Sequence, residues 1–182
     1  MKLITQTPKR ALNKASLKVK PNRTEIESFK TNLIQLLDRT NDTETEEFHK
    51  NLVIDFLKKT YYDPNHFVNT KGRNDLVIHN GNNSISSVGV ILEAKKPTNK
   101  TEMITTKKLN TKAFQELVLY YLRERITHKN LEVNYLIATN INECVSFDAM
   151  LFARLFAPNE NLVTQYNDFE SGRLADTKTD FF

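Results

Sequence analysis

Two short apolar runs separated by a turn constrain the fold of this chain most. Residues 75–79 (DLVIH) and 87–95 (SVGVILEAK) have the composition of β-strands, and the sequence NGNN lies between them at residues 80–83. Asn and Gly readily adopt the backbone conformations that tight hairpin turns require. The pattern therefore predicts an antiparallel hairpin whose second strand ends at Lys-Pro, residues 96–97.

Helical patterns flank this hairpin on both sides. Apolar residues recur at helical spacing in three segments: 24–41, 43–62 and 112–126. Capping-box sequences, with a Glu three residues after a Thr, start at Thr24 and Thr43 and predict the beginning of the first two helices. A further β run follows the third helix, which predicts a crossover connection that adds a strand at residues 133–139.

Weaker patterns complete the order of elements. They predict short strands at residues 67–68 and 145–147 and a helix at residues 148–156. Mixed order with a hairpin and a helical crossover predicts an α/β fold, in which helices flank a mixed β-sheet. A length of 182 residues fits one domain. We expect this domain to span residues 24–158, between an N-terminal arm (1–23) and a polar C-terminal tail (159–182).

Basic residues are concentrated in the arm. The chain has 26 basic and 22 acidic residues and a net charge of +4. The arm holds seven of these basic residues and no acidic one, so residues 24–182 carry a net charge of −3. Such an arm can contact a polyanion or act as a solubilising tail, and the sequence leaves both interpretations open.

Composition excludes several classes of protein. A single cysteine excludes a disulfide framework and a multi-cysteine metal site, and the four histidines lack the spacing of zinc ligands. No apolar run approaches the roughly 18 residues that a membrane span needs. The N-terminus has no apolar core of signal-peptide length. We therefore expect an intracellular, cytoplasmic protein with no membrane partner.

Three polar residues mark the ends of the hairpin strands. Asp75 begins the first strand, and Glu93 and Lys95 end the second. Because side chains alternate along a strand, Glu93 and Lys95 face the same side, roughly 6–7 Å apart. Neighbouring carboxylates repel each other unless a hard cation such as Mg²⁺ binds between them, and an adjacent ammonium can orient a metal-bound water. The same spacing also fits an ion pair at a solvent-exposed strand edge.

The arrangement resembles a known nuclease superfamily. An Asp, a hairpin and Glu-x-Lys followed by a crossover helix are similar to the PD-(D/E)XK nucleases, and more closely to the N-terminal nuclease domains of single-chain type IIG restriction–modification enzymes. The similar segments cover nearly the whole chain: LNKASLKVKPNRTEIESFKTNLIQLL, EEFHKNLVIDFLKKTYY, RNDLVIH, GVILEAKKP, FQELVLYYLRER, IATNINE and DFESGRLADTKTDFF.

The resemblance implies a restriction-endonuclease-like fold and a Mg²⁺-dependent endonuclease, with Mn²⁺ as a substitute, that cleaves double-stranded DNA. It implies that Asp75 and Glu93 bind the metal, that the carbonyl of Ala94 is a further ligand, and that Lys95 is the catalytic lysine. A homodimer would cut both strands. An alternative is a non-catalytic DNA-binding or docking module that keeps the fold, and a general interaction domain is a third interpretation.

Two further positions are assigned by the resemblance. A glutamate on an early helix often completes such sites, and either Glu46 or Glu47 is the candidate. Glu46 has a competing role as a capping-box acid, which favours Glu47. Gln115 matches a glutamine of the crossover helix, although Leu119 stands where an aromatic residue is usual. A helix-surface amide is the other interpretation of Gln115.

Related enzymes continue into a connector, an adenine methyltransferase and a target-recognition region in the same polypeptide. This chain has neither an Asn-Pro-Pro-aromatic tetrapeptide nor a glycine-rich cofactor loop. The tail would therefore lead toward parts that are missing here. Lys107, Lys108 and Lys112 follow the predicted hairpin and could hold phosphates, or form a solvated face.

Overall fold

Five strands form one mixed β-sheet in the computed structural model, which describes residues 5–71 and 74–173 but not the side chains of Lys71, Asn74 and Asp75. The strands follow one another in the sheet in chain order: β1 (Val68–Lys71), β2 (Asn74–His79), β3 (Val88–Ala94), β4 (Tyr135–Thr139) and β5 (Cys144–Asp148). Pairing is antiparallel except between β3 and β4, which are parallel. The predicted hairpin is thus β2–β3, in which Leu76 pairs with Leu92.

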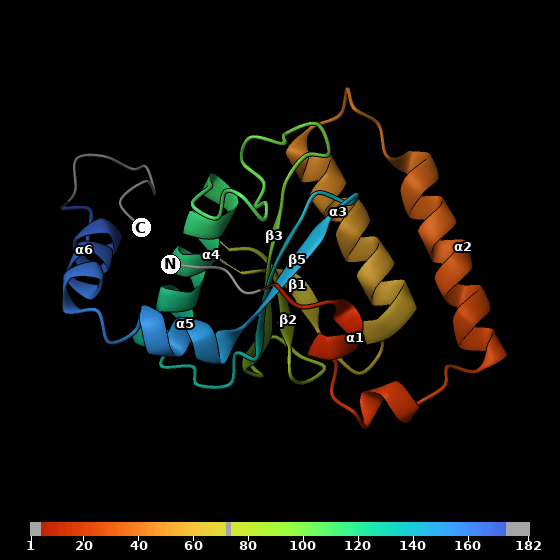
Figure 1. The fold of residues 1–182 in the computed structure, drawn as a ribbon, viewed down its shortest axis with the longest axis horizontal. Coiled ribbons are helices and arrows are strands. Elements are labelled where there is room, and N and C mark those ends of the chain that lie inside the picture. Colours follow the sequence, from red (N-terminus) through yellow and green to blue (C-terminus); the bar gives the residue numbers. More distant parts are fainter. Residues whose placement is uncertain (1–4, 72–73, 174–182) are drawn as a thin grey trace.

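Helices cover both faces of the sheet (Figure 1). The structure contains the helical segments α1 (Pro8–Ala11), η1 (Ser16–Lys18), α2 (Arg23–Arg39), α3 (Glu46–Leu57), η2 (Lys58–Tyr62), α4 (Lys112–Leu122), η3 (Arg123–Thr127), α5 (Ala149–Leu155) and α6 (Glu160–Glu170). On one face lie α4, α5 and α6, and on the other lies α3 with α2 outside it. The predicted α/β fold with a mixed sheet between helices is confirmed, and it is compatible with a restriction-endonuclease-like fold.

Strand alternation divides the buried apolar side chains into two cores. Val77 and Ile91 pack with α4 on one face of the sheet. Leu76 and Leu92, their neighbours in sequence, pack with Val53 of α3 on the other face. Because β2 and β3 are buried on both faces, they are nearly continuous apolar runs, and a polar side chain on them is an exception.

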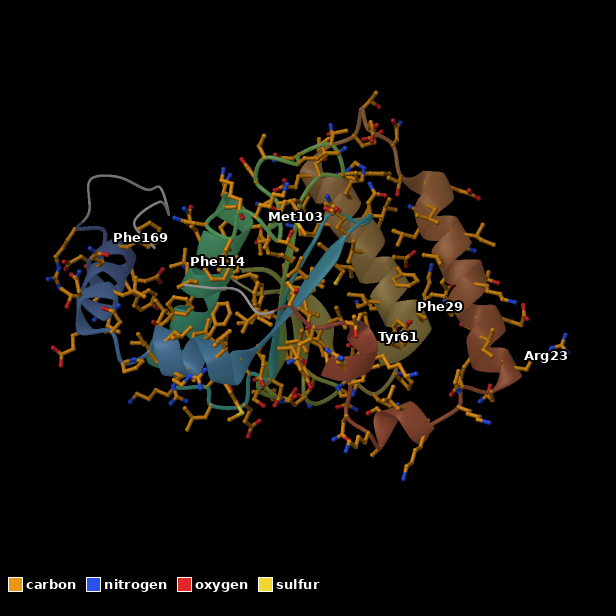
Figure 2. All side chains as sticks on the ribbon, in the orientation of Figure 1. Arg23, Phe29, Tyr61, Met103, Phe114 and Phe169 are labelled. Carbon is orange, nitrogen blue, oxygen red and sulfur yellow. The ribbon has the colours of Figure 1, made fainter. Side chains whose placement is uncertain are left out.

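The outer helix α2 is attached to the domain through aromatic contacts. The ring centroid of Phe29 lies 6.1 Å from that of Phe56. It lies 6.5 Å from that of Tyr61 (Figure 2). The helix begins one residue earlier than Thr24 predicts. Its N-cap is Asn22, which forms a complete capping box with Glu25. The predicted box at Thr24 was therefore wrong.

Helix α6 lies in the segment where the sequence pattern predicts only a polar tail. Its residues Leu162 and Tyr166 belong to the core that contains α4. Two polar contacts join it to η3: Tyr166 Oη lies 2.5 Å from Thr127 Oγ1, and Arg123 lies 2.5 Å from Glu170. These contacts and the buried face of Leu162 and Tyr166 hold α6 on the domain. None of the described helices is both long and apolar enough to cross a membrane.

The capping of α2 can be tested with two adjacent substitutions. Asn22→Ala removes the side chain that accepts from Glu25 N, so we expect the free energy of unfolding to fall by about 1 kcal/mol. Thr24→Ala leaves this box intact and should change that free energy by less than about 0.5 kcal/mol. Urea denaturation of both variants measures the difference. A larger loss in Thr24→Ala would place the cap at Thr24 after all.

Candidate active site

Glu93 and Lys95 lie together in the protein interior at the end of β3. Lys95 directly follows the strand, and its N–H donates to the carbonyl of Thr139 at 2.7 Å, which continues the pairing with β4. Both side chains are buried, with 1% and 2% of their surface exposed. The Lys95 ammonium lies 2.5 Å from Glu93 Oε1. The predicted common face is therefore confirmed, whereas the alternative of a solvent-exposed edge pair is wrong.

Helix α4 contributes a second carboxylate to this lysine. Glu116 Oε2 lies 2.7 Å from Lys95 Nζ. The helix reaches the site because the crossover from β3 to β4 lays it across the face that Glu93 and Lys95 share with Ile91. Lys95 is thus held between a strand and the helix that covers it.

The N-terminal turn of α3 approaches the same lysine from the side. Glu46 Oε1 lies 3.5 Å from Lys95 Nζ, and Glu46 Oε2 accepts a hydrogen bond from the N–H of Lys96 at 3.3 Å. Thr45, rather than Thr43, caps this helix by accepting from Phe48 N. Glu46 is therefore the first residue of the helix, and its carboxylate is used at the site and not in a capping box.

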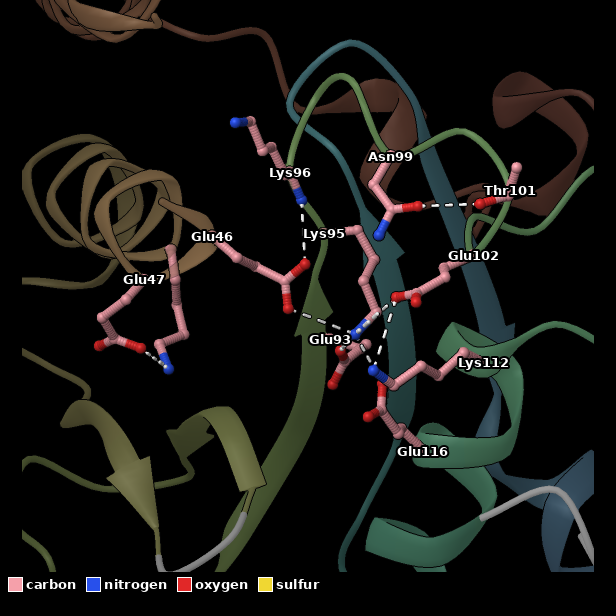
Figure 3. Close-up of polar contacts among 11 residues, drawn as sticks. Glu46, Glu47, Glu93, Lys95, Lys96, Asn99, Thr101, Glu102, Lys112 and Glu116 are labelled. Carbon is pink, nitrogen blue, oxygen red and sulfur yellow. Dashed lines mark hydrogen bonds and ion pairs between the residues drawn. The ribbon is translucent and has the colours of Figure 1, made fainter. Parts of the chain in front are cut away.

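The connection between β3 and α4 supplies one more acid. Glu102 Oε2 lies 3.9 Å from Lys95 Nζ and 3.7 Å from Lys112 Nζ. Among the described residues, four carboxylates thus lie within 4.0 Å of the Lys95 ammonium (Figure 3): those of Glu46, Glu93, Glu102 and Glu116. We call Lys95 and these four glutamates the Lys95 cluster.

The carboxylates keep Lys95 charged. Burial by itself lowers the pKa of a lysine, because the ammonium loses its hydration. Glu93 and Glu116 outweigh this effect, and the pKa of Lys95 lies above its ordinary value. At neutral pH Lys95 is therefore a fixed cation, able to orient a water molecule or stabilise negative charge but not to accept a proton.

The other predicted residues lie outside the cluster or were not described. Glu47 turns away from Lys95 and pairs with Lys50, as Figure 3 shows, and its side chain is 61% exposed. The structure thus places Glu46 at the site where the sequence favoured Glu47. Gln115 donates to Asn110 Oδ1 at 3.0 Å, and no contact joins it to Lys95 in the described structure.

Asp75 lies in β2, one residue before the pairing of Leu76 with Leu92. One step further along this antiparallel register, its backbone stands opposite that of Glu93. The side chain of Asp75 is outside the described part of the structure, so its convergence with Glu93 stays a prediction. The main chain of Ala94 pairs with Thr139 of β4, between the two residues of the expected site.

Glu116 and Glu102 were missed from the sequence. Glu116 stands directly before the apolar run LVLYYL, whose residues are all buried in α4. Glu116 therefore lies on a largely buried face of the helix. A charged residue on such a face needs a partner of opposite charge. That reasoning could have identified Glu116, but nothing local marks Glu102.

Comparison with known proteins gives one result. A family model described as a domain of unknown function (DUF7149) matches residues 6–182. The chain belongs to this family. No curated protein and no solved structure matches it. The match covers α6 and most of the N-terminal arm as well as the sheet, so these segments are part of the DUF7149 pattern.

The oxygen ligands expected in this DUF7149 domain suit a hard divalent cation. Among the described side chains, however, no three His, Cys, Asp or Glu are grouped so that they could hold a metal ion. Asp75 is not among those side chains. Of the expected acidic ligands, the structure describes the side chain of Glu93 alone, and a complete site would also require Asp75 and the carbonyl of Ala94.

Removing the central cation should destabilise the DUF7149 domain. Lys95→Met leaves the buried Glu93 and Glu116 without their counter-ion, so we expect the free energy of unfolding at neutral pH to fall by about 3–5 kcal/mol. Lys112→Met, at a lysine that is half exposed, is the matched control and should cost less than about 1 kcal/mol. Urea denaturation measures both, and equal losses would contradict a central role for Lys95.

The raised pKa of Lys95 predicts how the stability difference between wild type and Lys95→Met depends on pH. Because the folded-state pKa of Lys95 is raised, its stabilisation is complete below its unfolded pKa of about 10.4 and is lost as the pH rises toward the folded value. The difference between wild type and Lys95→Met should therefore not fall from about pH 7 to 9 and should decrease above about pH 10.4. A difference that already falls between pH 7 and 9 would contradict the raised pKa.

Proposed function

We propose that this domain is a Mg²⁺-dependent endonuclease that cleaves the phosphodiester bonds of double-stranded DNA in a restriction–modification system. The observation that carries the proposal is the burial of Glu93 and Lys95 together at the end of a central strand, with the backbone of Asp75 opposite that of Glu93, one register step beyond the Leu76–Leu92 pair. The resemblance to the PD-(D/E)XK nucleases supports it, because these are the positions at which such enzymes carry their acids and lysine.

Stability alone gives little reason for such a cluster. Buried ion pairs lose hydration energy that their attraction only partly restores, and apolar residues of similar size often serve a core equally well. Glu93 nevertheless lies on β3, a strand whose other side chains are mostly apolar and buried, and Lys95 directly follows this strand. Ionisable groups in such surroundings are frequent at catalytic sites. The cluster is therefore better explained by chemistry than by packing.

Each residue has a role in phosphodiester hydrolysis. The divalent cation, bound by Asp75, Glu93 and the carbonyl of Ala94, would supply a polarised water and neutralise charge at the phosphate. Lys95, which stays protonated, orients the attacking water and stabilises negative charge on the phosphoryl oxygens. Glu46 and Glu116 hold the Lys95 ammonium in place from two different helices.

The larger assembly is part of the proposal. In the resembling enzymes a methyltransferase and a target-recognition region share the polypeptide, and a homodimer of the nuclease domain would cut both strands. We propose the same partners for this domain, with the cytoplasm as its compartment. On its own the chain should therefore cut DNA slowly and with little sequence preference.

One observation favours a non-catalytic alternative. Glu93 and Glu116 are already paired with Lys95, and no three described His, Cys, Asp or Glu side chains are arranged to bind a metal. A DNA-binding module that kept this fold without cleavage would have the same features. Titration with Mg²⁺ or Mn²⁺, followed by thermal melting, separates the two functions. Stabilisation that disappears in Asp75→Asn supports the nuclease, and no response to either metal supports the alternative.

Cleavage assays test the individual roles. We expect Asp75→Asn, Glu93→Gln and Lys95→Met each to lower Mg²⁺-dependent cleavage of plasmid DNA by at least about 100-fold, because each removes a ligand or the cation that orients water. Thermal melting of each variant shows whether it is folded. Unchanged cleavage by a folded Lys95→Met protein would refute the mechanism.

Two adjacent glutamates provide a matched comparison. Glu46→Gln weakens a contact that positions Lys95, so cleavage should fall by about 10- to 100-fold. Glu47→Gln has the same chemistry but changes a residue that pairs with Lys50, and it should cleave like wild type. The reverse order of effects would restore Glu47 as the site residue.

A further inference from the structure

The connection between β3 and α4 is rich in lysine. Residues 96–112 contain five lysines and one glutamate, a net charge of +4 that equals the net charge of the whole protein. The lysines are Lys96, Lys100, Lys107, Lys108 and Lys112. We call residues 96–112, which end at the first residue of α4, the lysine connection.

The lysine connection is anchored at the Lys95 cluster. At its start, the N–H of Lys96 donates to Glu46. Near its end, the carbonyl of Glu102 accepts from the N–H of Ala113 at 3.1 Å. Its middle is buried through Met103 and Ile104, which are 1% and 2% exposed. Its path beside Lys95 is therefore determined by packing, as the loop above Lys95 in Figure 3 shows.

Three of its lysines are exposed and available. In the described structure no carboxylate pairs with Lys100, Lys107 or Lys108, whereas Lys112 pairs with Glu102. Lys107 and Lys108 are presented by a tight turn, in which the N–H of Thr105 donates to the carbonyl of Lys108 at 3.0 Å. Exposed threonine hydroxyls lie between the lysines at residues 98, 101, 105 and 106. Lysines and hydroxyls are the groups that bind nucleic-acid phosphates.

The acidic cluster explains why such a segment is needed. Four carboxylates lie around a single ammonium at Lys95, which leaves an excess of negative charge. A phosphodiester is itself anionic, so it would be repelled from this site unless other cations compensate. The lysine connection, which contributes Glu102 to this cluster, carries three exposed lysines that no described carboxylate pairs with.

The N-terminal arm is poorly placed for this purpose. Figure 1 shows α1 and the beginning of α2 in the lower part of the view and the lysine connection at the top. In Figure 2, Arg23 and Met103, which belong to these two regions, are correspondingly far apart. The described residues of the arm are all exposed, and no described hydrogen bond or ion pair joins them to the Lys95 cluster.

We propose that the lysine connection is a docking surface for the phosphate backbone of double-stranded DNA and holds it against the Lys95 cluster. This inference rests on the proposed function, because it identifies where the substrate of that site is bound. The basic arm, which the composition alone favours as the polyanion contact, contributes less to binding.

Two variants with the same change of charge test this surface. One carries Lys100→Gln, Lys107→Gln and Lys108→Gln, and the other carries Lys9→Gln, Arg10→Gln and Lys14→Gln in the arm. All six side chains are exposed, so both proteins should melt like wild type. Binding of a labelled duplex of about 20 base pairs is measured without divalent metal over roughly 50–200 mM salt.

We expect the first variant to bind on the order of tenfold or more weakly, and the slope of log K against log salt to decrease in magnitude by about 2–3. The arm variant should change this slope by less than about 1. An equal or larger effect of the arm variant would overturn the inference, and so would a wild-type chain that does not bind duplex DNA.

Mg²⁺-dependent cleavage by the same proteins separates this inference from the proposed function. If the first variant loses binding as expected but wild type does not cleave DNA, the surface stands and the nuclease proposal fails. If wild type cleaves and the first variant binds and cleaves equally well, the nuclease proposal stands and the surface is refuted.

Discussion

The ion pairs of the buried Lys95 ammonium are the interactions on which the rest of this structure depends. Glu93 and Glu116 bring two carboxylates into the apolar layer between the sheet and α4, and both contact this one cation at less than 3 Å. A carboxylate in such a place is tolerable only with a charged partner. Strand β3, the helix that covers it and the first turn of α3 therefore meet at a single residue, and their relative positions are linked through it.

This arrangement also determines what chemistry is available. Because the carboxylates raise the pKa of Lys95, the lysine remains a cation and does not act as a base. Glu46 reaches it from the first turn of α3, where the helix dipole favours a negative group, and Glu116 reaches it from the second turn of α4. A cation that is held from three elements is preorganised to stabilise negative charge. The cost is a concentration of carboxylates that repels an anionic substrate.

The distribution of charge in the fold follows from that cost. Four glutamates gather around Lys95, and the exposed lysines lie on the connection that follows β3 and contributes one of these four, Glu102. Met103 and Ile104 keep this connection beside the cluster by inserting into the core. Composition reveals only that the arm is basic, because it cannot show which basic segment lies near the acids. Proximity in space, and not the number of charges, makes the connection the better phosphate surface.

The sequence by itself determined the hairpin, the crossover helix and the common face of Glu93 and Lys95. These features follow from turn residues and from strand alternation, which act over a few neighbouring positions. Only the tertiary structure decided between Glu46 and Glu47, because adjacent helical residues point about 100° apart and the rotation of α3 is set by its packing on the sheet. It also brought Glu116 to Lys95 across 21 positions of the chain, a contact that depends on how the crossover helix lies on the sheet.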